Sequence, residues 1–226
     1  MNSEKVVGRK SLGDIVFDRI LRSIKSGAFA PDERLPTEHD LAAEFEVSRP
    51  IVREALQRLE TQAMLKRDGR SLIVATLDHN QLAELYTVRA ELEALAARLA
   101  ARHATPEEVR VLAQMVEDDQ KAVRDPEALA RANKRFHHQI HLASHNRYLV
   151  QQLDLVHRSM ALMARTTLAA KGRDAVSLAE HQDIVDAIAA RDEARAEAAL
   201  RRHISMAFET RLKEEAKLTG DMGLDE

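Results

Sequence analysis

Residues 35–69 read LPTEHDLAAEFEVSRPIVREALQRLETQAMLKRDG, and this stretch decides the fold of the N-terminal part of the chain. Thr37, with Asp40 three residues later, is a helix-start signal of the capping-box type, and Ser48 is a second candidate N-cap. The apolar spacing after each start predicts a short helix, a tight turn and a longer helix to about Gln62. The buried stripe of the longer helix is expected to consist of Ile51, Val52, Ala55, Leu56 and Leu59. The stretch therefore predicts a helix-turn-helix.

The second helix of this pattern carries arginines at its start. A helix-turn-helix places the N-terminal turn of its second helix in the major groove of DNA. Arg49 and Arg53 lie one turn apart there, a spacing that suits contacts with guanine edges or phosphates. The alternative is that they are ordinary solvated charges on a small helical domain. Six basic residues against three acidic ones in the range 47–73 favour DNA binding.

A basic hairpin is predicted after the second helix. Residues 64–67 and 71–75 can pair as short strands around Asp68-Gly69, a dipeptide typical of hairpin turns. Arg67 and Arg70 at its tip would reach the minor groove or the backbone of DNA, and the alternative is a loop with two scattered arginines. Upstream, the apolar spacing predicts an amphipathic helix over residues 14–26.

The stretch LPTEHDLAAEFEVSRPIVREALQRLE resembles the winged helix-turn-helix of the GntR transcriptional regulators, in which paired arginines, an LP turn and this apolar spacing recur together. The chain departs from the family pattern at His39, where an arginine that contacts phosphate is usual, and at Ala63 and Ser71, where glycines are usual. The resemblance implies double-stranded operator DNA as a partner. The implied DNA-binding residues are Ser48, Arg49, Pro50, Arg53, His39, Arg67 and Arg70.

Composition restricts the class of the whole protein. A length of 226 residues suggests two modest domains, and the scarcity of glycine (7) and proline (5) favours helix. Because there is no cysteine, disulfides and thiolate chemistry are excluded. No apolar run approaches the length of a membrane span, and the N-terminus lacks a signal-peptide core. We therefore expect a cytoplasmic protein with no membrane partner.

Beyond residue 77 the sequence predicts helices and no strand. The starts Thr105-Pro106 and Asp125-Pro126 combine an N-cap residue with proline in the first helical turn. The predicted helices cover residues 78–103, 105–123, 125–145, 146–170, 174–190 and 192–218. Six helices with short connections form an antiparallel bundle. The expected fold is mostly α, with a flexible tail at 1–10, a winged helix-turn-helix at 11–77, a helical bundle at 78–218 and a disordered tail at 219–226.

Polar side chains occupy apolar stripes on three of these predicted helices. Asn133 and His137 are spaced i,i+4, so an amide oxygen and an imidazole point the same way. His181 and His203 each lie in line with apolar residues of their own helix. Such a set leaves coordination positions open and suits a divalent transition metal. Taken singly, each histidine is more commonly a satisfied core residue.

The segments NKRFHHQIHLASHN and AEHQDIVDAIAARDEARAEAALRRHI resemble the metal-binding pattern of FCD domains, the ligand domains of FadR-type GntR regulators. The resemblance implies metal ligands at Asn133, His137, His181 and His203, with zinc, nickel or manganese as the metal. Asn133 departs from the aspartate that is common there, which removes one negative charge. Six helices rather than seven would place the domain in the smaller, VanR-like branch. The other histidines, at positions 39, 79, 103, 138, 141, 145 and 157, are not expected to bind metal.

Arg89 is predicted to point inward because it shares a stripe with Leu85 and Leu92. The segment YTVRAELEALAARLAA resembles the first helix of FCD domains, whose arginine helps hold a carboxylate effector. Beside a metal with open positions, its guanidinium would bind a small organic acid. The alternative is a structural ion pair with Glu93 or Glu180.

The expected function is that of a homodimeric, ligand-responsive transcriptional regulator, by default a repressor, and not an enzyme. Two DNA-binding domains would bind the halves of a palindromic operator, and an effector in the bundle would change that affinity. A metal-dependent, hydrolase-like enzyme is an alternative, because three histidines with an open position can activate water. Against it, no inward acid is expected near these helices. A third interpretation makes the histidine cluster purely structural, with the bundle serving only for dimerisation.

Overall fold

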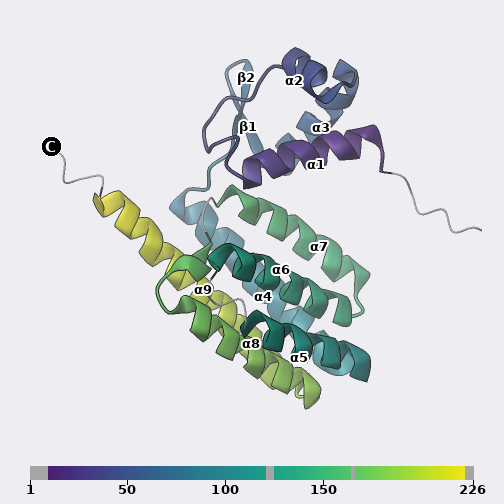
Figure 1. The fold of residues 1–226 in the computed structure, drawn as a ribbon, viewed down its shortest axis with the longest axis vertical. Coiled ribbons are helices and arrows are strands. Elements are labelled where there is room, and N and C mark those ends of the chain that lie inside the picture. The colour runs from purple at the N-terminus through teal and green to yellow at the C-terminus, as the bar shows by residue number, and fades with distance from the viewer. Residues whose placement is uncertain (1–9, 121–124, 164–165, 222–226) are drawn as a thin grey trace, which may run out of the picture. The chain divides into compact units, whose positions relative to one another are not determined.

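The computed structural model describes residues 10–120, 125–163 and 166–221, so most of both predicted tails lies outside the described residues. The chain divides into two compact units (Figure 1). The N-terminal unit comprises Met1–Leu77 with His157–Ala164, and the bundle unit comprises Asp78–Val156 with Arg165–Glu226. The segment His157–Ala164, which the sequence analysis assigns to the bundle, thus packs with the N-terminal elements.

The N-terminal unit has the predicted elements. Its elements are α1 Leu12–Lys25, α2 Glu38–Phe45, α3 Arg49–Thr61, β1 Leu65–Asp68 and β2 Ser71–Val74. The hydroxyl of Ser11 accepts a hydrogen bond from the backbone N–H of Asp14 at 3.0 Å, and Thr37 accepts one from that of Asp40 at 3.3 Å. Both caps are completed capping boxes, which fix where α1 and α2 begin. Glu46, at φ 55°, turns the chain between α2 and α3.

The hairpin of the N-terminal unit turns one residue later than predicted. Asp68 pairs with Ser71 as the last rung of the antiparallel ladder, so the two turn residues are Gly69 and Arg70. Gly69 has φ +59°, a left-handed conformation that glycine adopts without strain. Ala63, one of the departures from the pattern that the sequence resembles, is also left-handed, at φ 54°. This departure therefore strains the backbone locally and leaves the fold unchanged.

One apolar core joins the helices and the hairpin of the N-terminal unit. It includes Phe17 and Ile20 of α1, Leu41 of α2 and Leu59 of α3. Leu162, from the 3₁₀ helix η1 Met160–Leu162, is buried in the same core. The predicted continuous helix over 146–170 is therefore wrong, because the chain leaves the bundle to bury Leu162.

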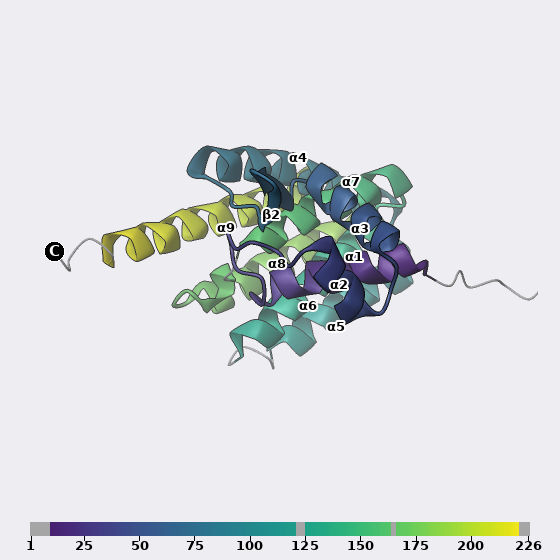
Figure 2. The same ribbon diagram turned by 90° about the horizontal axis from the view of Figure 1, so that it is seen from above.

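The bundle unit is helical throughout its described residues. Its elements are α4 His79–His103, α5 Pro106–Gln120, α6 Pro126–Ala143, α7 Arg147–Ser159, the 3₁₀ helix η2 Thr167–Ala169, α8 Arg173–Ala189 and α9 Glu193–Asp221. Figure 2 shows the C-terminal end of α9 extending beyond the other helices of the bundle. The backbone is helical as far as Asp221, so the tail predicted to be disordered from residue 219 begins with helix.

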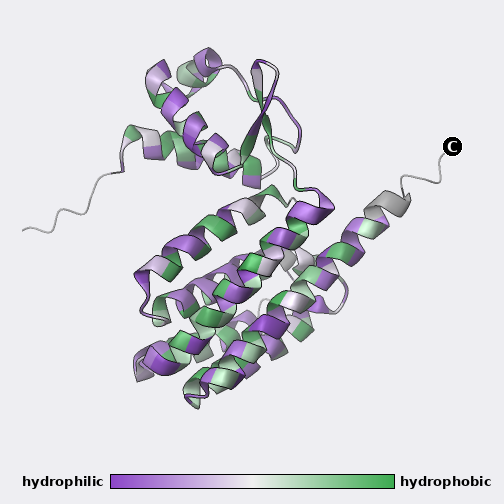
Figure 3. Cartoon of the chain, turned by 180° about the vertical axis from the view of Figure 1, so that it is seen from behind, coloured by the Kyte–Doolittle hydropathy of each residue, from purple (hydrophilic) through white to green (hydrophobic). Residues whose placement is uncertain are grey.

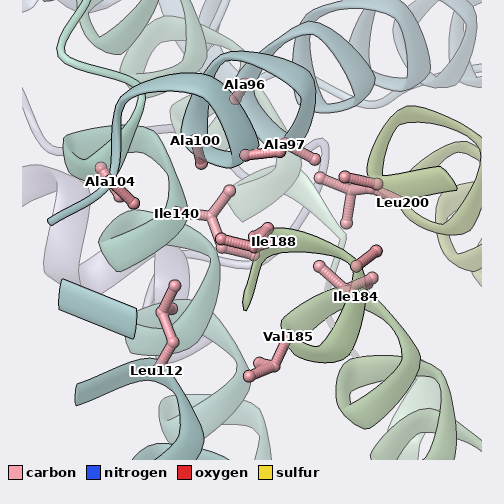
Figure 4. Packing of buried hydrophobic residues seen from close by; sticks show 14 of the residues in the cluster. Ala96, Ala97, Ala100, Ala104, Leu112, Ile140, Ile184, Val185, Ile188 and Leu200 are labelled. Carbon is pink, nitrogen blue, oxygen red and sulfur yellow. The ribbon is translucent and has the colours of Figure 1, made fainter. Parts of the chain in front are cut away.

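Small and branched side chains pack the centre of the bundle. In Figure 3 hydrophobic and hydrophilic bands alternate along each helix, as expected for helices that bury one face. Alanines at five positions of α4 are fully buried, which lets neighbouring helices approach closely. Figure 4 shows isoleucines of α6 and α8 and a leucine of α9 against this alanine face, namely Ile140, Ile184, Ile188 and Leu200.

The predicted fold class is confirmed: a winged helix-turn-helix precedes an all-α bundle with six α-helices in the described residues. In the described part of the chain, no helix is both long and apolar enough to cross a membrane.

Candidate functional site

The predicted DNA-contacting residues are all exposed on the N-terminal unit. Ser48 is the N-cap of α3, and Arg49 and Pro50 form its first turn with side chains open to solvent. The predicted residues elsewhere on this unit, Arg53, His39, Arg67 and Arg70, are exposed as well. Exposure at the start of the second helix is what major-groove contact requires. DNA contact itself stays a prediction.

Glu38 at the start of α2 holds the arginines of α3 in place. Its carboxylate accepts hydrogen bonds from Arg53 at 2.7 and 3.0 Å and lies 4.0 Å from Arg49. The hydrogen bond from Arg53, followed by the charges of Arg53 and Arg49, lowers the pKa of Glu38. The side chain of Arg53 is thus held by a carboxylate that lies between two guanidinium groups.

The second candidate site is a cluster of buried histidines in the bundle unit. His137 of α6, His181 of α8 and His203 of α9 are each at most 3% exposed. Their potential ligand nitrogens all lie within 4.8 Å of one another. The Nε2 atoms of His137 and His203 are 3.2 Å apart. Tertiary packing thus brings together the three histidines that the sequence analysis singles out.

Two glutamates hold the outer nitrogens of this cluster. The Nδ1–H of His137 donates to Oε2 of Glu93 at 3.0 Å, and the Nδ1–H of His203 donates to Oε2 of Glu180 at 2.7 Å. Because a carboxylate can only accept, these contacts fix the proton on Nδ1 and leave the Nε2 lone pairs for a central ion. Carboxylate-bound histidine is the usual arrangement around protein-bound metals.

Burial sets the protonation of the cluster. Desolvation lowers the pKa values of His181 and His203 well below the usual value, and it lowers that of His137 less because Glu93 opposes the shift. For Glu93 burial acts in the raising direction, but the interactions with His137 and His141 outweigh it and hold the pKa well below its ordinary range. The three imidazoles are therefore neutral near pH 7, the form that binds metal.

Atoms without partners test whether a metal fits. Neither ring nitrogen of His181 has a hydrogen-bond partner among the described residues, and neither does the buried Oδ1 of Asn133. Asn133 lies one helical turn before His137 on α6. Unsatisfied buried polar atoms are costly, so their presence points to a missing partner. The donor set of three imidazoles and one amide oxygen fits a divalent transition metal.

The structure places a further histidine beside this cluster and corrects one expectation. His141, which is not expected from the sequence to bind metal, is 1% exposed, and its Nε2 lies 2.9 Å from the same Glu93 oxygen that accepts from His137. The expectation that no inward acid lies near these helices is wrong, since Glu93 is fully buried and Glu180 contacts His203. The spacing of Glu93 four residues after the inward Arg89 is a signal that could have identified it.

Arg89 is buried as predicted, at 5% exposure. Its Nε lies 3.5 Å from Oε1 of Glu93, so the alternative of an ion pair with Glu93 is realised. The same Nε makes no hydrogen bond within the described residues. Arg89 therefore has a charge partner and retains a donor for a ligand.

Comparisons with known proteins agree with this architecture. Residues 12–74 match the family of bacterial regulatory proteins called gntR, and residues 84–206 match the FCD domain. The transcriptional regulator YdhC of Bacillus subtilis is 34% identical over 149 residues, which cover 62% of this chain and 66% of YdhC. The transcriptional repressor NanR of Escherichia coli K12 is 27% identical over 221 residues, covering 88% of this chain and 84% of NanR.

A solved structure shares the fold. The chain of E. coli McbR/YncC superposes with a TM-score of 0.78, covering 92% of this chain and 100% of that one. At 23% identity this similarity concerns the fold alone.

Proposed function

The chain belongs to the GntR family of bacterial regulatory proteins and carries an FCD domain, and we propose how this ligand-responsive transcriptional regulator works. The histidine cluster holds a divalent metal through His137, His181, His203 and Asn133. A small carboxylate binds the metal and Arg89, and its binding changes the affinity of the N-terminal unit for operator DNA. The metal supplies open coordination positions with positive charge, and the surrounding side chains orient its ligands.

The observation that carries this proposal is that two glutamates hold two of the histidines from the outer side of the cluster. Three neutral imidazoles converge from three helices, and carboxylates hold two of them with Nε2 toward the centre. A purely structural cluster gives no reason for both nitrogens of the buried His181 to lack a partner among the described residues. Imidazole-rich sites favour zinc or nickel over manganese.

The structure gives the enzyme alternative two inward carboxylates, but both are engaged. Glu93 contacts two histidines and Arg89, and Glu180 contacts His203 and Arg173. Neither is free to act as a general base. We therefore propose a regulator without catalytic activity.

The regulator is proposed to act as a homodimer that binds a palindromic operator, because a helix-turn-helix dimer reads two half-sites. Repression is the proposed mode, since the NanR relatives carry that description. The effector would shift the population between operator-competent and operator-incompetent states.

Metal content of the full chain, purified without chelator, tests the proposal. The wild type should hold about one metal ion per chain, and His181→Ala should lose it. His138→Ala, an exposed histidine next to His137, is the matched control and should keep it. Absence of metal from the wild type, together with no stabilisation by added zinc, nickel or manganese, would refute the metal site. Operator binding would be measured in parallel and does not depend on that result.

A further inference from the structure

Arg173, at the start of α8, is a buried arginine that the sequence analysis did not single out. Its side chain is 5% exposed, and one terminal nitrogen donates to Oε2 of Glu180 at 2.7 Å. The other two donor groups, at Nε and Nη1, are buried and have no hydrogen-bond partner among the described residues. Each of these unused guanidinium donors can make a charge-assisted hydrogen bond to a carboxylate oxygen.

Ser177 lies one helical turn after Arg173 and also has a buried polar group without a hydrogen-bond partner among the described residues. The residue is 2% exposed, and its hydroxyl makes no hydrogen bond within the described residues. His181 follows after another turn, and neither of its nitrogens makes a hydrogen bond to any residue that the structure describes. The inward face of α8 thus carries a row of unsatisfied donors from Arg173 to the proposed metal ligand.

This row is adjacent to the histidine cluster. The Glu180 oxygen that accepts from Arg173 also accepts from Nδ1 of His203, so one atom links Arg173 to a proposed metal ligand. Gly172, the N-cap of α8, provides no side-chain capping bond. The positive end of the helix dipole therefore adds to the charge of Arg173.

The charges around the histidine cluster indicate what charge a ligand of the metal-loaded site should carry. Two arginines and two glutamates border the cluster, with Glu93 beside Arg89 and Glu180 beside Arg173, so their charges cancel in pairs. The proposed ligands of the metal are neutral, because they are three imidazoles with lowered pKa values and the amide of Asn133. A divalent ion would leave two positive charges uncompensated in a buried site. Such a site favours a ligand with two negative charges.

We infer that the effector is a small dicarboxylate, with one carboxylate on the metal beside Arg89 and the other held by the unused donors of Arg173 and Ser177. This inference rests on the proposed function, because the first carboxylate needs the metal. The contact of the second carboxylate with Arg173 and Ser177 gives the start of α8 a role in binding, which the contact of the first carboxylate with the metal and Arg89 does not require. A monocarboxylate would satisfy the metal and leave Arg173 and Ser177 unpaired.

Calorimetric titration of the metal-loaded full chain tests the inference with acids of matched carbon number. The probes are malonate, succinate and glutarate, each compared with propionate, butyrate or valerate. At least one diacid should bind the wild type ten or more times more tightly than its monoacid. Arg173→Gln and Ser177→Ala should each remove most of this preference and leave monoacid affinity within about threefold. Arg195→Gln removes an exposed charge of the same sign from the bundle unit and should change nothing.

Ser177→Ala is the sharper variant, because its hydroxyl has no partner to lose in the ligand-free protein. If Arg173→Gln disturbs Glu180 and lowers metal content, Arg173→Lys and Ser177→Ala decide the question. No preference for any diacid in the wild type, or equal weakening of both acids in the variants, would overturn the inference. If the wild type takes up no metal, the proposed metal site fails separately. The thermal midpoint of the metal-free chain then decides the second subsite, which requires that diacids raise it in an Arg173-dependent way.

Discussion

Replacing Glu93 with glutamine would test whether the carboxylate behind the histidines controls metal affinity. Glu93 is fully buried, so the isosteric change preserves packing. Its Oε2 accepts from His137 at 3.0 Å and from His141 at 2.9 Å, while Oε1 faces Arg89 at 3.5 Å. A glutamine has one accepting oxygen and one donating amide, so it cannot preserve the contacts at both positions.

The magnitude follows from the contacts that are lost. Removing an outer partner of a metal-bound histidine weakens metal affinity by about 10- to 100-fold, and we expect this range for Glu93→Gln. The change also leaves Arg89 without its charge partner in the interior. Breaking one side of a buried ion pair costs about 3–5 kcal/mol. The free energy of unfolding of the metal-free protein should therefore fall by an amount of that order.

Metal affinity would be measured by competition with a chromophoric chelator, and stability by urea denaturation of the metal-free protein. Glu91→Gln on the same helix is the matched control, because that side chain is 64% exposed and pairs with Arg201 at the surface. The control should change neither quantity appreciably. A Glu93→Gln protein that binds metal within twofold of the wild type would refute the role assigned to this carboxylate.

Three further predictions concern separate parts of the molecule. Arg53→Ala should weaken binding to operator DNA selected in vitro by about 5- to 150-fold in fluorescence anisotropy, as expected for loss of one base contact; an equal loss in Arg22→Ala would show a general charge effect instead. Ala63→Gly should raise the free energy of unfolding by up to about 1 kcal/mol, because φ at this position is 54°; an unchanged urea midpoint would contradict this. Burial lowers the pKa values of His181 and His203 in the folded chain. As the pH falls through about 6.5, these histidines therefore become protonated in the unfolded metal-free chain but stay neutral in the folded one. Its free energy of unfolding should therefore decline below about pH 6.5, by up to about 1.4 kcal/mol per pH unit for each histidine, whereas equal urea midpoints at pH 7.5 and 5.5 would exclude that account.

Local sequence signals predicted most elements of the fold because short-range interactions determine them. Thr37 with Asp40, and Asp125 before Pro126, mark helix starts whose capping bonds the structure contains. The same signals failed for residues 146–170. The sequence there continues with helix-forming residues, but burial of Leu162 in the N-terminal core ends α7 at Ser159. Such a contact depends on a distant part of the chain.

The candidate site shows the same division. Stripe positions on single helices identified His137, His181 and His203, because an inward imidazole is visible from the apolar period of its own helix. They did not identify His141, since α6 packs against both α4 and α5 and its buried face is wider than one stripe. Glu93 was identified only as a possible ion-pair partner of Arg89, because its contacts with His137 and His141 depend on how α4 and α6 pack together.

The sequence by itself therefore determined the order of the elements, the DNA-binding motif and the three central histidines, all of which depend on spacing within one helix or turn. Tertiary structure alone decided that Glu93 contacts two histidines and that Glu180 joins His203 to Arg173. It also decided that Arg173 and Ser177 keep donors without a partner in the described part of the chain. These facts depend on which helices are neighbours and how they are rotated. The hydrophobic burial that sets those rotations acts over the whole core and is carried by no single segment.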